Sequence, residues 1–127
     1  MIIQDLTLTN FRVFEGSHTI EVKPKADNRV VLFGGLNGAG KTSILTAIRF
    51  ALLGRAAIEG APSQKEYVNK LSEMVHGQRS DLQASIELVF SYQLEGKETL
   101  YRVKRSWELG SQDKLTIYAN GEEMMAR

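Results

Sequence analysis

Several features are missing from this 127-residue chain, and each absence excludes a class of protein. Without cysteine, the chain has no disulfide framework, no thiolate metal site and no cysteine nucleophile. The longest apolar stretch, Ile44 to Leu53, is interrupted by Thr46 and Arg49 and falls short of a membrane span. The N-terminus lacks the basic and apolar regions of a signal peptide. These absences favour a soluble cytoplasmic protein without a membrane partner.

The chain also lacks an excess of charge of either sign. Its 16 lysines and arginines stand against 15 aspartates and glutamates, which leaves a net charge of +1. This balance excludes nucleic-acid binding through bulk charge alone, although a local basic patch would still allow it. Hydrophobic residues make up 43% and charged residues 24%, and both values are typical of a globular domain.

Alternating hydrophobic residues predict antiparallel strands near both ends of the chain. Residues 2–9 and 18–22 alternate on either side of a turn at Glu15-Gly16, which indicates a hairpin. From residue 82 the same period returns and predicts a three-stranded meander over 82–119, with one face buried and one exposed to solvent.

Two helices are predicted between these strands. Apolar residues at helical spacing indicate a helix over 41–53. Ser63 and Glu66 have the spacing of a capping box, so a second helix is expected to begin there and to end at His76-Gly77. Its apolar stripe is typical of ordinary core contact.

One motif carries chemistry. Residues 35–42, Gly-Leu-Asn-Gly-Ala-Gly-Lys-Thr, match the phosphate-loop pattern G-x-x-x-x-G-K-[ST]. A continuous apolar run at 30–33, typical of a strand buried on both faces, precedes the loop, and the helix predicted at 41–53 follows it. The glycines let backbone N–H groups converge on phosphate oxygens, and the helix N-terminus adds partial positive charge. The alternative is a glycine-rich turn without a ligand.

The residue types of the loop predict individual roles toward a nucleoside triphosphate. Lys41 is expected to reach the β- and γ-phosphates and to neutralise charge during transfer, which makes it the candidate catalytic residue. The Thr42 hydroxyl is expected to be the metal ligand, holding Mg²⁺.

The chain lacks the second acidic motif that hydrolysis requires. Such an acid follows a second buried strand, where it holds Mg²⁺ and orients water. No run of four apolar residues is followed by Asp or Glu here, and only residues 30–33 have the character of a buried parallel strand. The chain is therefore expected to be an incomplete P-loop ATPase that is inactive alone.

The N-terminal half resembles the start of an ATPase head of the SMC/Rad50/RecF group. The matching residues are Asn10-Phe11-Arg12, the phosphate loop, and the helix sequence from Thr42 to Gly54. A head of that group is split in sequence: its N-terminal part carries the phosphate loop (Walker A), and its C-terminal part follows a long coiled coil with the signature motif and Walker B. The string from Leu32 to Thr42 most resembles the DndD ATPases of bacterial DNA phosphorothioation.

The resemblance implies an α/β fold, the N-terminal half of an ABC-type P-loop ATPase head with an antiparallel β lobe. It divides the lobe 1–127 into a hairpin and phosphate-loop unit (1–55), a loop and helix (56–81) and the meander (82–121). ATP and Mg²⁺ would be the cofactors. The implied nucleotide contacts are Gly35, Asn37, Gly38, Ala39, Gly40, Lys41, Thr42, Ser43 and Arg12.

The role of Arg12 has two interpretations. It would contact phosphate or base near the nucleotide, or it would be a surface arginine paired with a carboxylate. Arg102, Lys104 and Arg105 form a basic cluster that would contact DNA phosphate or simply be a solvated strand face. His18 and His76 have no partner at metal-ligand spacing.

The implied partners are the C-terminal half of the same protein, a second ATPase head that completes the ATP site, DNA bound through the head dimer, and other Dnd proteins. Two alternatives remain within the ATPase class: a Rad50/SbcC-type repair head and a RecF-like head. The alternative from another class is a non-catalytic nucleotide-binding interaction module.

Overall fold

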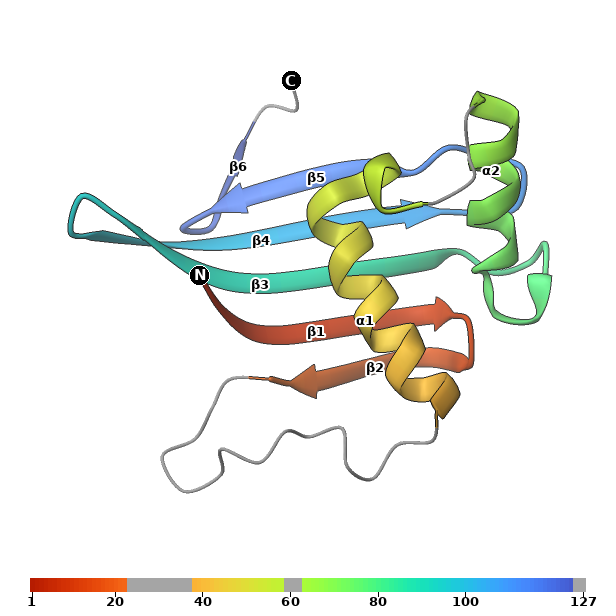
Figure 1. Ribbon diagram of the computed structural model, residues 1–127, viewed down its shortest axis with the longest axis horizontal. Helices are drawn as coiled ribbons and strands as arrows, with labels where there is room; N and C mark the ends of the chain where they lie inside the picture. Colours follow the sequence, from red (N-terminus) through yellow and green to blue (C-terminus); the bar gives the residue numbers. More distant parts are fainter. Residues whose placement is uncertain (23–37, 59–62, 125–127) are drawn as a thin grey trace.

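The computed structural model describes residues 1–22, 38–58 and 63–124. Within these ranges, one antiparallel sheet of six strands is crossed on one face by the longer helix, α1 (Figure 1). The strands are β1 (Ile2–Phe11), β2 (Phe14–Glu21), β3 (Ala84–Leu94), β4 (Lys97–Trp107), β5 (Lys114–Ala119) and β6 (Glu122–Met124). The helices are α1 (Gly38–Leu53) and α2 (Gln64–Glu73), with 3₁₀ turns at Gly54–Ala57 and His76–Gln78.

The strand order is β2-β1-β3-β4-β5-β6, so the N-terminal hairpin and the C-terminal meander form a single sheet. Strand β1 joins them, because it pairs with β2 on one side and with β3 on the other. The predicted strand at 30–33 and the loop residues Gly35 and Asn37 lie outside the described residues.

The N-terminal hairpin is confirmed, but its predicted turn was wrong. The strands are joined at Arg12-Val13, with Phe11 paired to Phe14, and Glu15-Gly16 belong to β2. Asn10 and Arg12 adopt positive φ angles of 49° and 51°, which brings the chain round earlier than the glycine. The Asn10 side chain then accepts a hydrogen bond from the Gly16 N–H at 2.9 Å.

The meander is confirmed. Alternation places Ala84, Ile86 and Leu88 of β3 on the face toward α1, where all three are buried. The meander ends at a turn, Asn120-Gly121, which leads into the short strand β6. The alternation also continues through β4. Arg105 pairs in register with Ile86 and therefore shares the inner face of the sheet with Trp107.

Helix α1 is confirmed and begins at Gly38, before the predicted start at Lys41. Its buried face carries Ile44, Ala47, Phe50 and Ala51, which belong to one core with Leu6, Leu8 and Phe11 of β1. The Trp107 ring meets Phe50 edge to face at 5.4 Å, and its indole N–H donates to the Leu71 carbonyl at 2.8 Å. This core fixes α1 across the sheet.

The capping residue of α2 is confirmed, because the Ser63 hydroxyl accepts a hydrogen bond from the Glu66 N–H at 3.2 Å. The helix ends at Glu73, earlier than predicted. The chain leaves the helix there because Val75 forms a β-bridge with Phe11 of β1. Among the described residues, neither helix has both the length and the hydropathy needed to cross a bilayer.

Candidate nucleotide site

The N-terminal end of α1 carries the described part of the phosphate-loop motif, from Gly38 to Thr42. The first N–H groups of a helix have no partner within the helix and concentrate its partial positive charge. No acidic residue in the first turn of α1 offsets that charge. Lys41 and Thr42 are exposed to solvent. This end of the helix is therefore suited to an anion, with a cation and a hydroxyl beside it.

Ser43, the next residue, is fully buried at 0% exposure. Its hydroxyl has no hydrogen-bond partner within the described part of the chain. Leaving a buried hydroxyl unsatisfied costs about 1–3 kcal/mol, so such groups are rare without a functional reason. An incoming oxygen ligand would relieve this cost. The buried, unpartnered hydroxyl of Ser43 is the observation that best fits a phosphate at this end of α1.

Arg12 comes to α1 from the turn between β1 and β2. Its guanidinium Nη1 donates to the Thr46 hydroxyl at 3.3 Å. Thr46 lies one helical turn after Thr42, on the same side of α1. Arg12 has no carboxylate partner among the described residues, which disfavours the surface ion-pair interpretation of this residue.

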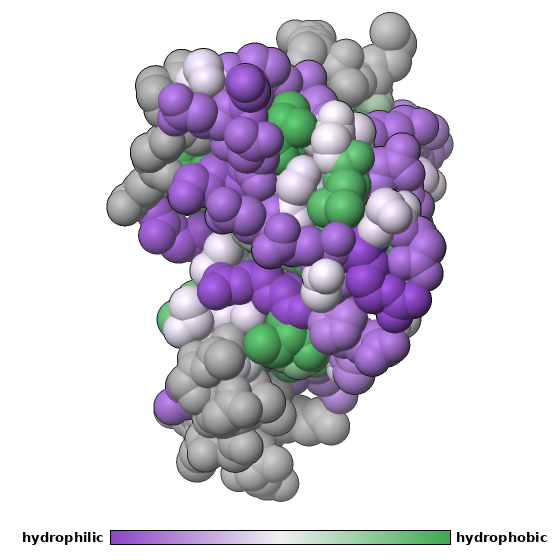
Figure 2. Space-filling view, turned by 90° about the vertical axis from the view of Figure 1, so that its right-hand side faces the viewer, coloured by the Kyte–Doolittle hydropathy of each residue, from purple (hydrophilic) through white to green (hydrophobic). Residues whose placement is uncertain are grey.

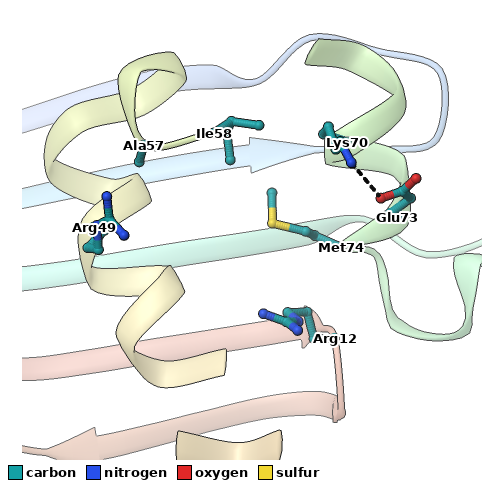
Figure 3. A pocket seen from close by; sticks show the side chains of 7 residues that line it. All are labelled: Arg12, Arg49, Ala57, Ile58, Lys70, Glu73 and Met74. Carbon is teal, nitrogen blue, oxygen red and sulfur yellow. Dashed lines mark ion pairs between the residues drawn. The ribbon is translucent and has the colours of Figure 1, made fainter. Parts of the chain in front are cut away.

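An open pocket of about 460 Å³ lies between α1 and α2, and Arg12 forms part of its wall. Figure 3 shows Arg12 at the end of β1, Arg49 on α1, and Lys70 with Glu73 on α2. The other lining residues are Ala57, Ile58 and Met74.

The pocket favours an anionic ligand. Its three cationic side chains face one carboxylate, and Lys70 already pairs with that carboxylate of Glu73 at 3.9 Å. The end of the molecule that carries α2 and the β1–β2 turn is mainly hydrophilic, with hydrophobic residues in small separate patches (Figure 2).

Sequence reasoning missed two residues of this pocket, Arg49 and Lys70. Arg49 interrupts the apolar stretch of α1, and its spacing from Thr46 places both on neighbouring positions of one helix face. That spacing was an available signal. Lys70 carried no such signal, because its place near α1 depends on how α2 packs.

The basic cluster predicted in the meander does not form as a unit. The Arg105 guanidinium lies on the inner face, where Nη1 pairs with Asp113 at 2.8 Å and Nε donates to the Ala51 carbonyl at 3.2 Å. Arg102 stays on the outer face, 3.8 Å from Glu87 and stacked over the Tyr118 ring at 4.6 Å. The pairing of Arg102 fits a solvated strand face better than a DNA contact.

The two histidines have local roles. His18 contacts the Glu15 carbonyl at 2.6 Å and the Phe14 ring, and His76 contacts the Arg12 carbonyl at 2.7 Å. The described ranges contain no group of His, Asp and Glu side chains able to hold a metal ion.

Comparison with known proteins places the chain in a family. The sequence pattern of the AAA domain family matches residues 5–126. Arcadin-4 of Pyrobaculum calidifontis is 33% identical over 122 residues, which are 96% of this chain and 13% of that protein. The "Probable DNA double-strand break repair Rad50 ATPase" of Aquifex aeolicus is 27% identical over 120 residues, which are 94% of this chain and 11% of that protein.

The fold has a counterpart among solved structures. The SMC head domain from Thermotoga maritima superposes with a TM-score of 0.50 at 20% identity, covering 98% of this chain and 39% of that chain. At this identity the likeness concerns the fold alone. The chain spans only a small part of the length of the curated relatives that it matches. It belongs to the AAA domain family, with the fold of the N-terminal part of an SMC/Rad50-like P-loop ATPase head.

Proposed function

We propose that this chain binds ATP·Mg²⁺ at the N-terminal end of α1, as the nucleotide-binding part of an ATPase that acts on DNA. The observation that carries the proposal is the buried, unpartnered hydroxyl of Ser43 beside the exposed Lys41 and Thr42. A phosphate oxygen would supply the missing partner, and the helix N-terminus would stabilise its charge.

Each motif residue has a distinct role in this proposal. Lys41 neutralises the β- and γ-phosphates, and Thr42 ligates Mg²⁺. Backbone N–H groups of Gly38, Ala39 and Gly40 contact phosphate oxygens, together with Gly35 and Asn37 of the preceding loop. Arg12 contacts the remainder of the nucleotide, which extends toward the pocket between α1 and α2.

Hydrolysis requires parts that this chain does not contain. The chain covers 39% of the SMC head and lacks a Walker B pattern, so the C-terminal half of the same protein would supply the second acid. A second head would supply the signature motif and enclose ATP between the two heads. DNA would then contact the head dimer rather than this nearly neutral lobe. We propose that residues 1–127 form one lobe of the head, made of three units: residues 1–55, 56–81 and 82–121.

Two roles in DNA metabolism are proposed for the full-length protein. The loop sequence from Leu32 to Thr42 supports a DndD-like role in DNA phosphorothioation, alongside other Dnd proteins. The match to a protein named as a Rad50 double-strand break repair ATPase supports a repair role instead. The full-length sequence discriminates between them, because a Cys-x-x-Cys zinc hook in a coiled coil favours the Rad50 type.

Isothermal titration calorimetry of ATP·Mg²⁺ with the protein that carries this chain tests the proposal. Lys41→Ala should weaken binding roughly 100-fold or more, because it removes a cation from a cluster of phosphate charges. Lys41 is exposed, so the melting temperature should not change. Lys104→Ala is the matched control, since it removes an exposed lysine of the outer sheet face. Equal affinities for Lys41→Ala and the wild type would contradict the proposal.

A phosphate-release assay with residues 1–127 alone tests the need for the missing half. We expect no ATP turnover above background from this segment. Robust hydrolysis by it would show that the second acid and the second head are dispensable.

A further inference from the structure

The backbone of Arg12 is held in a conformation that arginine rarely adopts. Its φ angle is 51°, in the left-handed region where the Cβ atom of any L-residue is crowded. Such conformations persist where surrounding contacts determine them, and they concentrate at functional sites. The contacts that hold Arg12 are therefore of interest in themselves.

Two hydrogen bonds from the segment after α2 fix this backbone on both sides. The Arg12 N–H donates to the Met74 carbonyl at 2.8 Å. The Arg12 carbonyl lies 2.7 Å from Nδ1 of His76. A carbonyl only accepts, so Nδ1 of His76 carries the proton and donates. The bridge between Phe11 and Val75 holds the two segments side by side.

The Arg12 side chain makes its hydrogen bond on α1. The guanidinium reaches α1, where it donates to Thr46 and faces the pocket (Figure 3). His76 therefore acts on Arg12 through the backbone alone. On its other side, Nε2 of His76 lies 3.7 Å from the Glu15 carboxylate, which also lies 3.8 Å from Arg79. These neighbours orient the imidazole ring.

We propose that His76 is a positioning residue for the nucleotide site: by donating to the Arg12 carbonyl, it holds the left-handed turn that aims the guanidinium at the bound nucleotide. This inference rests on the proposed function, since it requires Arg12 to contact ATP. Without the Nδ1 donor, the turn relaxes and Arg12 leaves the position next to Thr46. The segment after α2 is thereby coupled to nucleotide affinity.

The test is the ATP·Mg²⁺ affinity of the full-length protein with three substitutions at one position. His76→Ala should weaken binding about 3- to 10-fold, the range that corresponds to one hydrogen bond. His76→Asn places an amide nitrogen where Nδ1 stood and should restore most of the affinity. His76→Gln places its amide nearer the position of Nε2 and should behave like His76→Ala. Equal affinity in all three would overturn the proposal.

A coupling measurement separates positioning from a general loss of structure. In an Arg12→Ala background, where the guanidinium is absent, His76→Ala should cause no further loss of affinity. An equal loss in both backgrounds would overturn the proposal. Val103→Ala serves as a control, because it truncates a buried side chain that does not line the pocket and should lower the melting temperature without changing affinity.

Failure of the inference is distinguishable from failure of the proposed function. If Lys41→Ala leaves affinity unchanged, the nucleotide site itself is wrong. If Lys41→Ala and Arg12→Ala weaken binding while His76→Ala does not, the site stands and the positioning role fails.

Discussion

The two ends of α1 differ in how their polar groups are satisfied. At the C-terminal end, the Ala51 carbonyl accepts from Arg105, and Arg105 pairs with Asp113. The side chains of this pair are only 13% and 6% exposed, and Tyr67 donates to the second oxygen of Asp113 at 2.5 Å. At the N-terminal end, the Ser43 hydroxyl is buried without a partner among the described residues.

Gly54 shows how closely the C-terminal end is packed. Its φ angle is 59°, and a Cβ atom there would lie 2.9 Å from a guanidinium nitrogen of Arg105. A residue with a Cβ atom would be strained by this backbone and would displace the Arg105 guanidinium. The C-terminal end of α1 is thus fixed by polar contacts in addition to the core, and the proposed function places the ligand at the other end. Under the proposed function, stability and binding are assigned to opposite ends of one helix.

The largest effect on the free energy of unfolding is expected at the C-terminal end of α1. Asp113→Ala should lower the free energy of unfolding by about 3–5 kcal/mol, because it leaves Arg105 buried without its counter-charge. Urea denaturation followed by circular dichroism measures this loss. Asp81→Ala is the matched control, since it removes the exposed carboxylate partner of Arg79 and should leave the denaturation midpoint unchanged. Equal midpoints for Asp113→Ala and Asp81→Ala would contradict the anchoring role.

A smaller effect on the free energy of unfolding, of opposite sign, is expected at the N-terminal end of α1. Ser43→Ala removes a buried hydroxyl without a partner, so it should raise the unfolding free energy of the nucleotide-free protein by about 1 kcal/mol. The same substitution should weaken ATP·Mg²⁺ binding. Ser72→Ala is the control, because that hydroxyl donates to the Val68 carbonyl and accepts from the Gly110 N–H, so its loss should destabilise. Destabilisation by both substitutions would contradict the account of Ser43.

The smallest effect is a pH dependence of stability, caused by Tyr67 near the C-terminal end of α1. Burial, followed by the hydrogen bond to Asp113, raises the pKa of the Tyr67 phenol well above its usual value. The unfolded chain releases this proton near pH 10, while the folded protein retains it, so stability should fall as the pH rises above about 10. Melting temperatures between pH 8 and pH 11 should show this decline, and Tyr67→Phe should flatten it. An identical slope in Tyr67→Phe would assign the decline to other groups.

The sequence predicted the elements of the fold well, because each depends on a local pattern. Period-two alternation located β3 and β4, and the Ser63 cap located the start of α2. The turn at Arg12-Val13 was missed because a glycine stood nearby at Gly16, and the positive φ of Arg12 depends on hydrogen bonds from a distant segment.

The candidate site was predictable only in part. The phosphate-loop motif gave Lys41 and Thr42 by spacing alone. The family resemblance added Ser43, and its burial follows from packing. The inward place of Arg105 follows from strand alternation, but its partner Asp113 stands in a loop that tertiary contacts position. The pocket joins Arg12, Arg49 and Lys70 from three separate elements, which no local pattern connects.

Hydrogen–deuterium exchange of the full-length protein, with and without ATP·Mg²⁺, compares the two ends of α1 directly. The account predicts that nucleotide slows exchange at residues 38–46, where amide groups gain phosphate partners, and leaves 50–54 and 105–113 unchanged. Slower exchange at 50–54 alone, or no change at 38–46 under saturating nucleotide, would contradict it.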